Sequence, residues 1–377
     1  MPAQPLIDSL YAYNDWANQQ VLSLAADLSD GQLDAPRPMG FGTLRATLFH
    51  ILAADTIWLE RWQGVPWRPF PMDPQGMSRA AMAEQLAEVA QRRRQLVDAE
   101  RGEGWQRIVD YRDSKQTPYQ HQLRDLLLHV FHHGVHHRAQ ALNYLKHFGR
   151  QVAWGIDYPL YRLASGAETQ SAAAVELLQA HGLSPSATPA PPLQWEPQHV
   201  QRLLEYHRWA NQRVLQAAAQ LSDTQLDQAF PIGHGSLRKI LTHMLDVEAW
   251  WLDNWTAQPR PRTASDTRAN ETAAGDTARG IADLAARWQT VAQQSDAYLA
   301  NLNGEQAARV LEVPVRGVEL RIAIADSAVH VVCHGTHHRA QLVNLFRQVG
   351  APVGNIDLLY ALAELTPPPP AECEDQR

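Results

Sequence analysis

Cysteine is nearly absent from this sequence. Only Cys333 and Cys373 occur in 377 residues, which excludes a framework of disulfides and leads us to expect a reducing compartment. No apolar run reaches the roughly 18 residues that a membrane-spanning helix needs. The first residues, MPAQPLIDSLYAYNDW, lack the basic segment and apolar run of a secretory signal. These absences together predict a cytoplasmic protein without a membrane partner.

The sequence also lacks an excess of positive charge. It has 33 Lys and Arg against 40 Asp and Glu, a formal net charge of −7, so nothing in the charge balance favours nucleic acid or an anionic membrane as partner. Walker loops, dinucleotide fingerprints, nucleophile elbows and HExxH motifs are missing as well. The common sequence signatures of nucleotide and hydrolase chemistry are therefore not available to explain a function.

What the sequence does contain is a long internal repeat. LYAYNDWANQQVLSLAADLSDGQLD (10–34) returns as LLEYHRWANQRVLQAAAQLSDTQLD (203–227), and DLLLHVFHHGVHHRAQALNYLKHFG (125–149) returns as DSAVHVVCHGTHHRAQLVNLFRQVG (326–350). A unit of this length indicates a duplicated domain rather than a solenoid repeat. We place the two domains at 1–166 and 198–366, with a Pro/Ala-rich linker at 167–197 and a disordered tail at 367–377.

The periodicity within each copy is helical. We expect a first helix over 5–28, and second helices that begin after the N-caps Thr43 and Ser236 and end near Trp62 and Trp255. Third helices are expected over 78–100 and 276–302, and fourth helices over 122–147 and 326–349. Alternation over 309–324 predicts a short β-hairpin. The predicted fold is all-α: two tandem four-helix bundles, each with a short hairpin and a small extra helix.

The stretch HVFHHGVHHRAQ (129–140) holds five histidines. Residues four apart share a helix face, so three pairs could each bind a metal ion: His129/His133, His132/His136 and His133/His137. The second copy has Cys333 in place of His132, while His330, His334 and His338 remain. His133 belongs to both pairs that are kept, so His133 and His137 are the preferred ligands.

A third imidazole is available on the second helix. His50 and its counterpart His243 lie among apolar residues, where a single histidine is more often a hydrogen-bonded core residue. Here each copy combines one such histidine with a pair on the fourth helix, and neighbouring bundle helices lie close enough for one ion to bridge them. Three neutral imidazoles leave a fourth position open for water or substrate, which is typical of catalytic metal sites.

The helix-2 pattern LxHxxxxDxxW and the helix-4 pattern HxxxHRAQ, in bundles of this size, resemble the DinB family, whose fold is shared with YfiT-like and mycothiol-dependent maleylpyruvate isomerase proteins. The resemblance covers both halves. It implies one divalent ion per half and up to two per chain, zinc or nickel first and iron or manganese as further options. It also implies ligands at the positions that match the family motif: His50, His133, His137, His243, His334 and His338. Both copies have Ala139 and Ala340 where the family has Gly.

Several neighbours recur in both copies. His129 and His330 could orient a ligand or enter the site themselves, and an inward-facing polar role without metal is an equal alternative. Arg138, Arg339, Gln140 and Gln341 could also support the ligands, although bonding between helices is the favoured interpretation. Asp55 and Glu248 are expected to pair with Arg138 and Arg339.

The resemblance implies a metal-dependent enzyme of the thiol S-transferase, isomerase or hydrolase type. A small-molecule substrate is then expected, and a low-molecular-weight thiol as co-substrate. No general acid or base can be assigned from the sequence, so the catalytic residues are unknown. The alternatives are a non-catalytic metal-binding stress-response protein and a helical interaction protein. The two copies could also pack as an intrachain pseudo-dimer.

Overall fold

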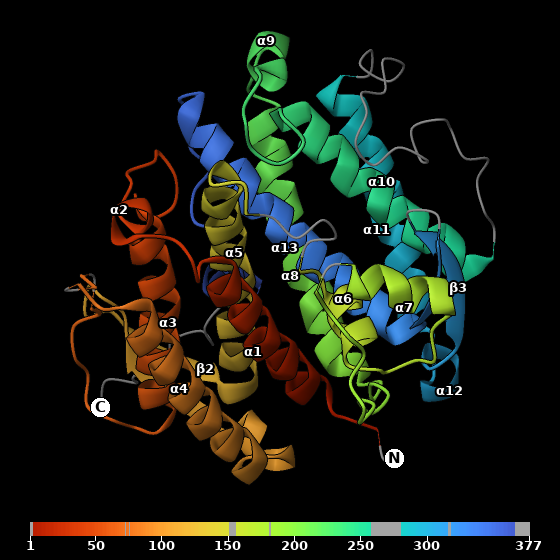
Figure 1. Ribbon diagram of the computed structural model, residues 1–377. Helices are drawn as coiled ribbons and strands as arrows, with labels where there is room; N and C mark the ends of the chain where they lie inside the picture. Colours follow the sequence, from red (N-terminus) through yellow and green to blue (C-terminus); the bar gives the residue numbers. More distant parts are fainter. Residues whose placement is uncertain are drawn as a thin grey trace, which may run out of the picture.

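The computed structural model describes residues 3–71, 73–74, 76–150, 156–180, 182–257, 280–315 and 318–365. Each half contains four long helices. In the first half these are α1 (Leu6–Leu24), α3 (Leu44–Trp62), α4 (Arg79–Ala99) and α5 (Leu123–His147). In the second they are α8 (Pro197–Ala218), α10 (Leu237–Thr256), α11 (Ile281–Ala300) and α13 (Ile324–Gln348). The two sets occupy opposite sides of the molecule (Figure 1), which confirms the predicted pair of helical bundles.

Shorter elements complete each half. The first half adds α2 (Asp30–Leu33), the 3-10 helix η1 (Gly102–Gln106), strands β1 (Ile108–Arg112) and β2 (Pro118–Gln122), and α6 (Tyr158–Ala164). The second adds α9 (Asp223–Asp227), α12 (Gly304–Ala307), β3 (Val310–Val315), β4 (Val318–Ala323) and α14 (Leu358–Leu365). Each strand pair forms an antiparallel hairpin directly before the last long helix. The hairpins and extra helices were predicted, whereas the shortest helices were not.

The helix starts follow the predicted caps. Thr43 Oγ1 accepts a hydrogen bond from the Ala46 amide at 3.0 Å, and Ser236 Oγ accepts one from the Lys239 amide at 3.2 Å. Such bonds satisfy amides that have no partner within the helix. The first helix is shorter than predicted: it ends at Leu24, because Ser29 starts a separate short helix with a capping box.

The segment predicted as a linker contains a helix of its own, α7 (Ala172–Gln179), which packs on β4. Just before this helix, Gln170 Nε2 donates to the Arg321 carbonyl at 2.8 Å. Farther along, the Gln4 amide donates to the Pro192 carbonyl at 2.8 Å. The segment is thus attached to both halves. The predicted domain boundaries remain a prediction, and the predicted tail at 367–377 lies outside the described residues.

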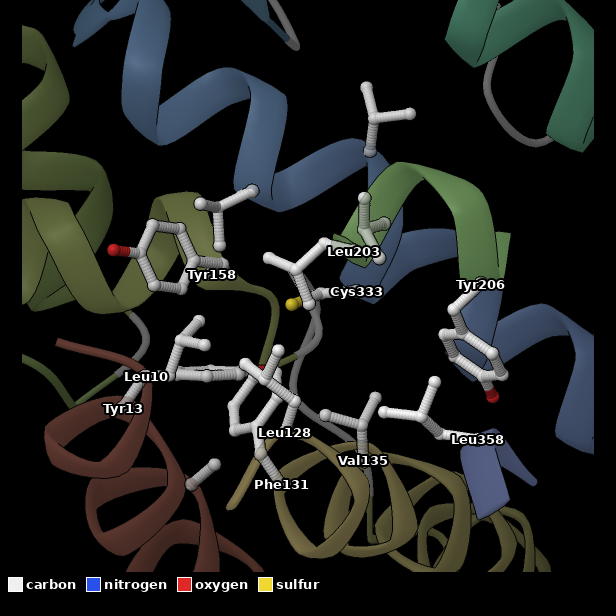
Figure 2. Close-up of a cluster of buried hydrophobic side chains, with 14 of the residues drawn as sticks. Leu10, Tyr13, Leu128, Phe131, Val135, Tyr158, Leu203, Tyr206, Cys333 and Leu358 are labelled. Carbon is white, nitrogen blue, oxygen red and sulfur yellow. The ribbon is translucent and has the colours of Figure 1, made fainter. Parts of the chain in front are cut away.

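The two halves share one continuous hydrophobic core. Helix α5 packs against α13, while α6 crosses to α13 and α14 crosses to α5. Figure 2 shows this interface, with side chains from both halves around the buried thiol of Cys333. His132 also lies here, 2% exposed, and its Nδ1 is 3.1 Å from the hydroxyl of Thr336. The interface is therefore built like the interior of a domain.

One ion pair crosses this interface in full burial. Arg162 Nε on α6 lies 3.0 Å from Asp326 Oδ1 on α13, and the two side chains are 3% and 1% exposed. The hydroxyl of Tyr158 donates to the same carboxylate oxygen at 3.2 Å. The counterpart of Asp326 in the first half is Asp125, which pairs with the partly exposed Arg124 and Arg202 instead. The repeat makes the two carboxylates equivalent, but the arginine that pairs with Asp326 is 3% exposed, whereas those that pair with Asp125 are 15% and 19% exposed.

Candidate metal centres

The first half gathers three histidines between α3 and α5. His50 Nε2 lies 3.0 Å from His133 Nε2, and nitrogen atoms of these two residues and of His137 all lie within 4.8 Å of one another. The ring centroids are 4.3 to 4.9 Å apart. Helix α5 presents two of the rings because residues four apart share a face, and α3 supplies the third. All three residues are thus brought together, as the sequence predicted; we call this cluster the first centre.

The second half repeats the arrangement between α10 and α13. His243 Nε2 lies 3.0 Å from His334 Nε2, and the rings of His334 and His338 are 4.3 Å apart. A further histidine joins here: nitrogen atoms of His234, His243 and His338 all lie within 4.8 Å of one another. His234 was not among the ligands predicted from the sequence. Its signal was present, because GHG at 233–235 stands where the first half has GFG at 40–42. We call this cluster the second centre.

A glutamine orients one ligand in each centre. Nδ1 of His137 donates to Gln140 Oε1 at 2.9 Å, and Nδ1 of His338 donates to Gln341 Oε1 at the same distance. Because a carbonyl oxygen can only accept, the proton must reside on Nδ1, and the lone pair of Nε2 remains free for a metal. Gln140 Nε2 in turn lies 3.1 Å from Nε2 of His136, and Gln341 and His337 repeat this contact.

Replacing Gln140 tests this support. Gln140→Leu removes the acceptor and leaves the His137 ring free to turn, so we expect the metal affinity of the first centre to fall by roughly 10–100-fold. Gln140→Glu keeps an acceptor oxygen and should preserve most of the affinity. Competition titration against a chromogenic chelator measures both. Equal affinities of the leucine variant and the unchanged chain would contradict the role of Gln140.

The recurring arginines serve the bundles rather than the ligands. Arg138 Nη1 donates to Asn18 Oδ1 on α1 at 3.0 Å and also to Asn14, and Arg339 Nη1 donates to Asn211 Oδ1 on α8 at 2.8 Å. A Cβ added to Gly134 would lie 2.9 Å from Arg138 Nη1, so the glycine within HHGVHH makes room for this side chain. For the arginines, the bonding between helices that the sequence favoured is what the structure shows. For Gln140 and Gln341 that expectation was wrong, because both bond to histidines of their own helix.

The acidic residues on α3 and α10 do not pair with those arginines, contrary to the sequence-based expectation. Asp55 accepts a hydrogen bond from Arg93 of α4 at 2.8 Å. Glu248 accepts one from Trp288 of α11 at 2.7 Å and also forms an ion pair with Arg208. Each carboxylate is turned toward the third long helix of its bundle, about 140° around the helix from the histidine five residues earlier. They hold the bundles together beside the centres.

His129 and His330 lie one turn before the ligand pairs. The ring of His129 is 5.9 Å from that of His133 and packs edge-on against Trp58 at 5.1 Å, and His330 is 5.3 Å from His334. Neither contributes to the close sets of nitrogen atoms found among the described residues. In both, Nδ1 is buried without a hydrogen-bond partner in the described part of the chain. Each of the two histidines therefore packs beside its centre without belonging to the close set of nitrogen atoms.

Burial keeps the ligand imidazoles neutral. It lowers the pKa of His50 to about 2, with a contribution from His137, and the pKa of His137 to about 4. It lowers the pKa of His243 to about 3, with His234 adding to the effect, and those of His133, His334 and His338 well below the usual value. Neutral imidazoles offer lone pairs to a metal ion at pH 7. The donor set, its orientation and its protonation state all fit a divalent ion.

The same burial predicts acid sensitivity of the metal-free chain. Unfolding returns the histidine pKa values to about 6.5, so below that pH the unfolded chain binds protons that the folded chain does not. The melting temperature after chelation should therefore fall between about pH 7 and pH 5, each such histidine removing up to about 1.4 kcal/mol of stability per pH unit. His330→Phe removes one of these groups, whose pKa burial lowers to about 3, and should flatten the slope. A melting temperature that rises on acidification would contradict this account.

Fold and site together define a class: helical bundles in which histidines of two helices converge on one point, here present twice. The DinB family model matches residues 1–170 and 197–370, so the chain belongs to the DinB family and carries two tandem copies of its domain. Protein DinB of Bacillus subtilis (strain 168) is 24% identical over 153 residues, which cover 40% of this chain and 85% of that protein. No solved structure gives a significant match. None of the described helices combines the length and apolarity required to cross a membrane.

Proposed function

We propose that each half binds one divalent metal ion and that the protein is a metal-dependent enzyme that transfers a low-molecular-weight thiol to an electrophilic small molecule. The observation that carries the proposal is the first centre, where three neutral imidazoles converge and leave a coordination position for a further ligand. The two halves act as an intrachain pseudo-dimer through α5 and α13.

The residues around the first centre suit a small reactant. Phe41 stacks on His50 at 3.9 Å between ring centroids, and Phe70 lies 5.2 Å from the same ring. These aromatic side chains form an apolar wall that can contact an organic electrophile. When bound, the metal ion would lower the pKa of a coordinated thiol, so that the thiolate is available at neutral pH. His50, His133 and His137 would hold that ion, and Gln140 retains the Nδ1 proton of His137.

A cation of the opposite half acts on His234 in the second centre, and another acts on His136, which lies beside the first centre. Burial lowers the pKa of His234 to about 4, and Lys146 of the first half lowers it further. Burial likewise lowers the pKa of His136, and Arg347 of the second half is among the positive charges that add to this effect. A cation near a metal centre favours anionic ligands, and a thiolate is one.

The test uses the full-length chain loaded with Zn²⁺ or Ni²⁺, glutathione as thiol and 1-chloro-2,4-dinitrobenzene as electrophile. The reaction forms the carbon–sulfur bond, breaks the carbon–chlorine bond and releases chloride and a proton, and the product is followed by absorbance. We expect the rate to fall to the uncatalysed value after chelation and to return when metal is restored. Stoichiometric metal binding without acceleration, with cysteine and coenzyme A as further thiols, would favour the non-catalytic metal-binding protein instead.

A further inference from the structure

The two centres differ at one loop position. The loop before α3 reads MGFGT at 39–43, and the loop before α10 reads IGHGS at 232–236, so His234 is the counterpart of Phe41. Both loops have the same backbone form, because Gly40 and Gly42 have φ of 49° and 85° while Gly233 and Gly235 have φ of 54° and 93°. The residue between each pair of glycines is held over its centre in the same way.

The ring positions agree closely. The ring centroids of Phe41 and His50 are 3.9 Å apart with an interplanar angle of 30°, and those of His234 and His243 are 3.9 Å apart with an angle of 31°. The ring centroids of Phe41 and His137 are 5.4 Å apart, and those of His234 and His338 are also 5.4 Å apart. Replacing phenylalanine by histidine therefore places two nitrogen atoms where the first half has only carbon.

Those nitrogen atoms are within reach of an ion bound by the other three histidines. Nitrogen atoms of His234, His243 and His338 lie within 4.8 Å of one another, and His334 Nε2 is 3.0 Å from His243 Nε2. Ligand nitrogens around a tetrahedral ion with bonds of 2.0–2.1 Å lie about 3.4 Å apart, so the His234 side chain must rotate to bring its nitrogen to an ion that His243, His334 and His338 share. No hydrogen bond to another described residue holds the ring back.

We propose that His234 is a fourth ligand of the second centre and takes the coordination position that the first centre leaves open. This rests on the proposed metal binding and adds a division of roles. A closed set of four imidazoles holds a tetrahedral divalent ion such as Zn²⁺ in a structural manner. The first centre, with Phe41 in place of the fourth nitrogen, is then the one that accepts a thiol or another external ligand.

The experiment measures zinc release to the chelator 4-(2-pyridylazo)resorcinol. The first measurement uses a His137→Ala background, in which the first centre is disabled. There His234→Phe should speed zinc release from the second centre. Loss of a group that only orients a ligand weakens metal binding by roughly 10–100-fold, so loss of a ligand should have at least that effect. Phenylalanine is accommodated in this loop of the first half, so the variant is matched to a side chain that the fold already carries. In a His243→Ala, His338→Ala background, Phe41→His should slow release from the first centre.

A second measurement uses Co²⁺ in the same two backgrounds. Azide should change the visible spectrum of cobalt at the first centre and leave that of the second centre unaltered until His234 is replaced by phenylalanine. If the wild-type chain binds two ions but neither loop substitution alters the release rate or the azide response in its background, the role of His234 is overturned while metal binding stands. A wild-type chain that binds no zinc would overturn the proposed function and this inference together.

Discussion

A chain carrying His137→Ala is expected to bind one divalent ion instead of two. The substitution leaves the first centre with His50 and His133 alone, and two imidazoles without an enforced third ligand hold an ion weakly. The affinity should fall by more than the roughly 10–100-fold that loss of a supporting group costs. Metal analysis after dialysis against a weak chelator measures the stoichiometry. Thiol transfer should be lost together with this ion if the first centre is the open one.

The second centre should respond differently to the equivalent change. His338→Ala leaves His234, His243 and His334, so this variant should keep its ion with lower affinity, and loss of the second ion should require His243→Ala as well. His147→Ala, on the same helix as His137 but outside the centre, is the control and should retain both ions. An unchanged stoichiometry of two in His137→Ala would refute the ligand assignment for the first half.

The second large effect concerns the interface between the halves. Asp326→Ala leaves the buried guanidinium of Arg162 without its carboxylate, and removal of one partner from a buried ion pair costs about 3–5 kcal/mol. We expect the free energy of unfolding, measured by chemical denaturation with the metal state held constant, to fall by that amount. The loss of stability should affect both halves, because the ion pair joins α6 of the first half to α13 of the second.

Asp125→Ala is the matched control, since this residue occupies the same place in the first turn of α5 that Asp326 occupies in α13. Its partners are partly exposed, so the cost should be about 1 kcal/mol or less. The double variant Arg162→Leu, Asp326→Leu replaces the pair by apolar side chains and should recover most of the stability. The repeat already has a leucine, Leu362, at the position in the second copy that corresponds to Arg162. Equal losses in the two single variants would show that helix-end electrostatics and not the buried pair are responsible.

Local rules were sufficient to predict the long helices and the shared face of His133 and His137, whereas the third ligand, His50, followed from its recurrence in the second copy and from the family resemblance. Thr43, Ser78 and Ser236 cap the helices that they were expected to start, and Gly149 and Gly350 follow the last long helices with positive φ. These features depend on side chains a few residues apart, and such information is contained in a short window of sequence. The spacing of four between His133 and His137 fixed their common face for the same reason.

What could not be predicted depends on contacts between distant parts of the chain. Asp55 has Arg93 as partner because α4 packs beside α3, and no spacing rule indicates which arginine comes within reach. His234 lies in a loop nine residues before His243, and only the folded loop shows that its ring stacks on that ligand. Helix α7, in a stretch with a linker-like composition, owes its place to packing on β4.

Because the two copies are fused in one chain, each side of their interface can change independently. In a symmetric homodimer every substitution occurs on both sides of the axis. Two identical first halves would bring His132 of each subunit against Val135 of the other, a buried imidazole beside a side chain that cannot bond to it. In this chain the counterparts have diverged separately: His132 meets the hydroxyl of Thr336, and Val135 shares its apolar cluster with Cys333 (Figure 2). The two sides of the interface can thus differ as in a heterodimer, and because they belong to one chain their association does not weaken on dilution.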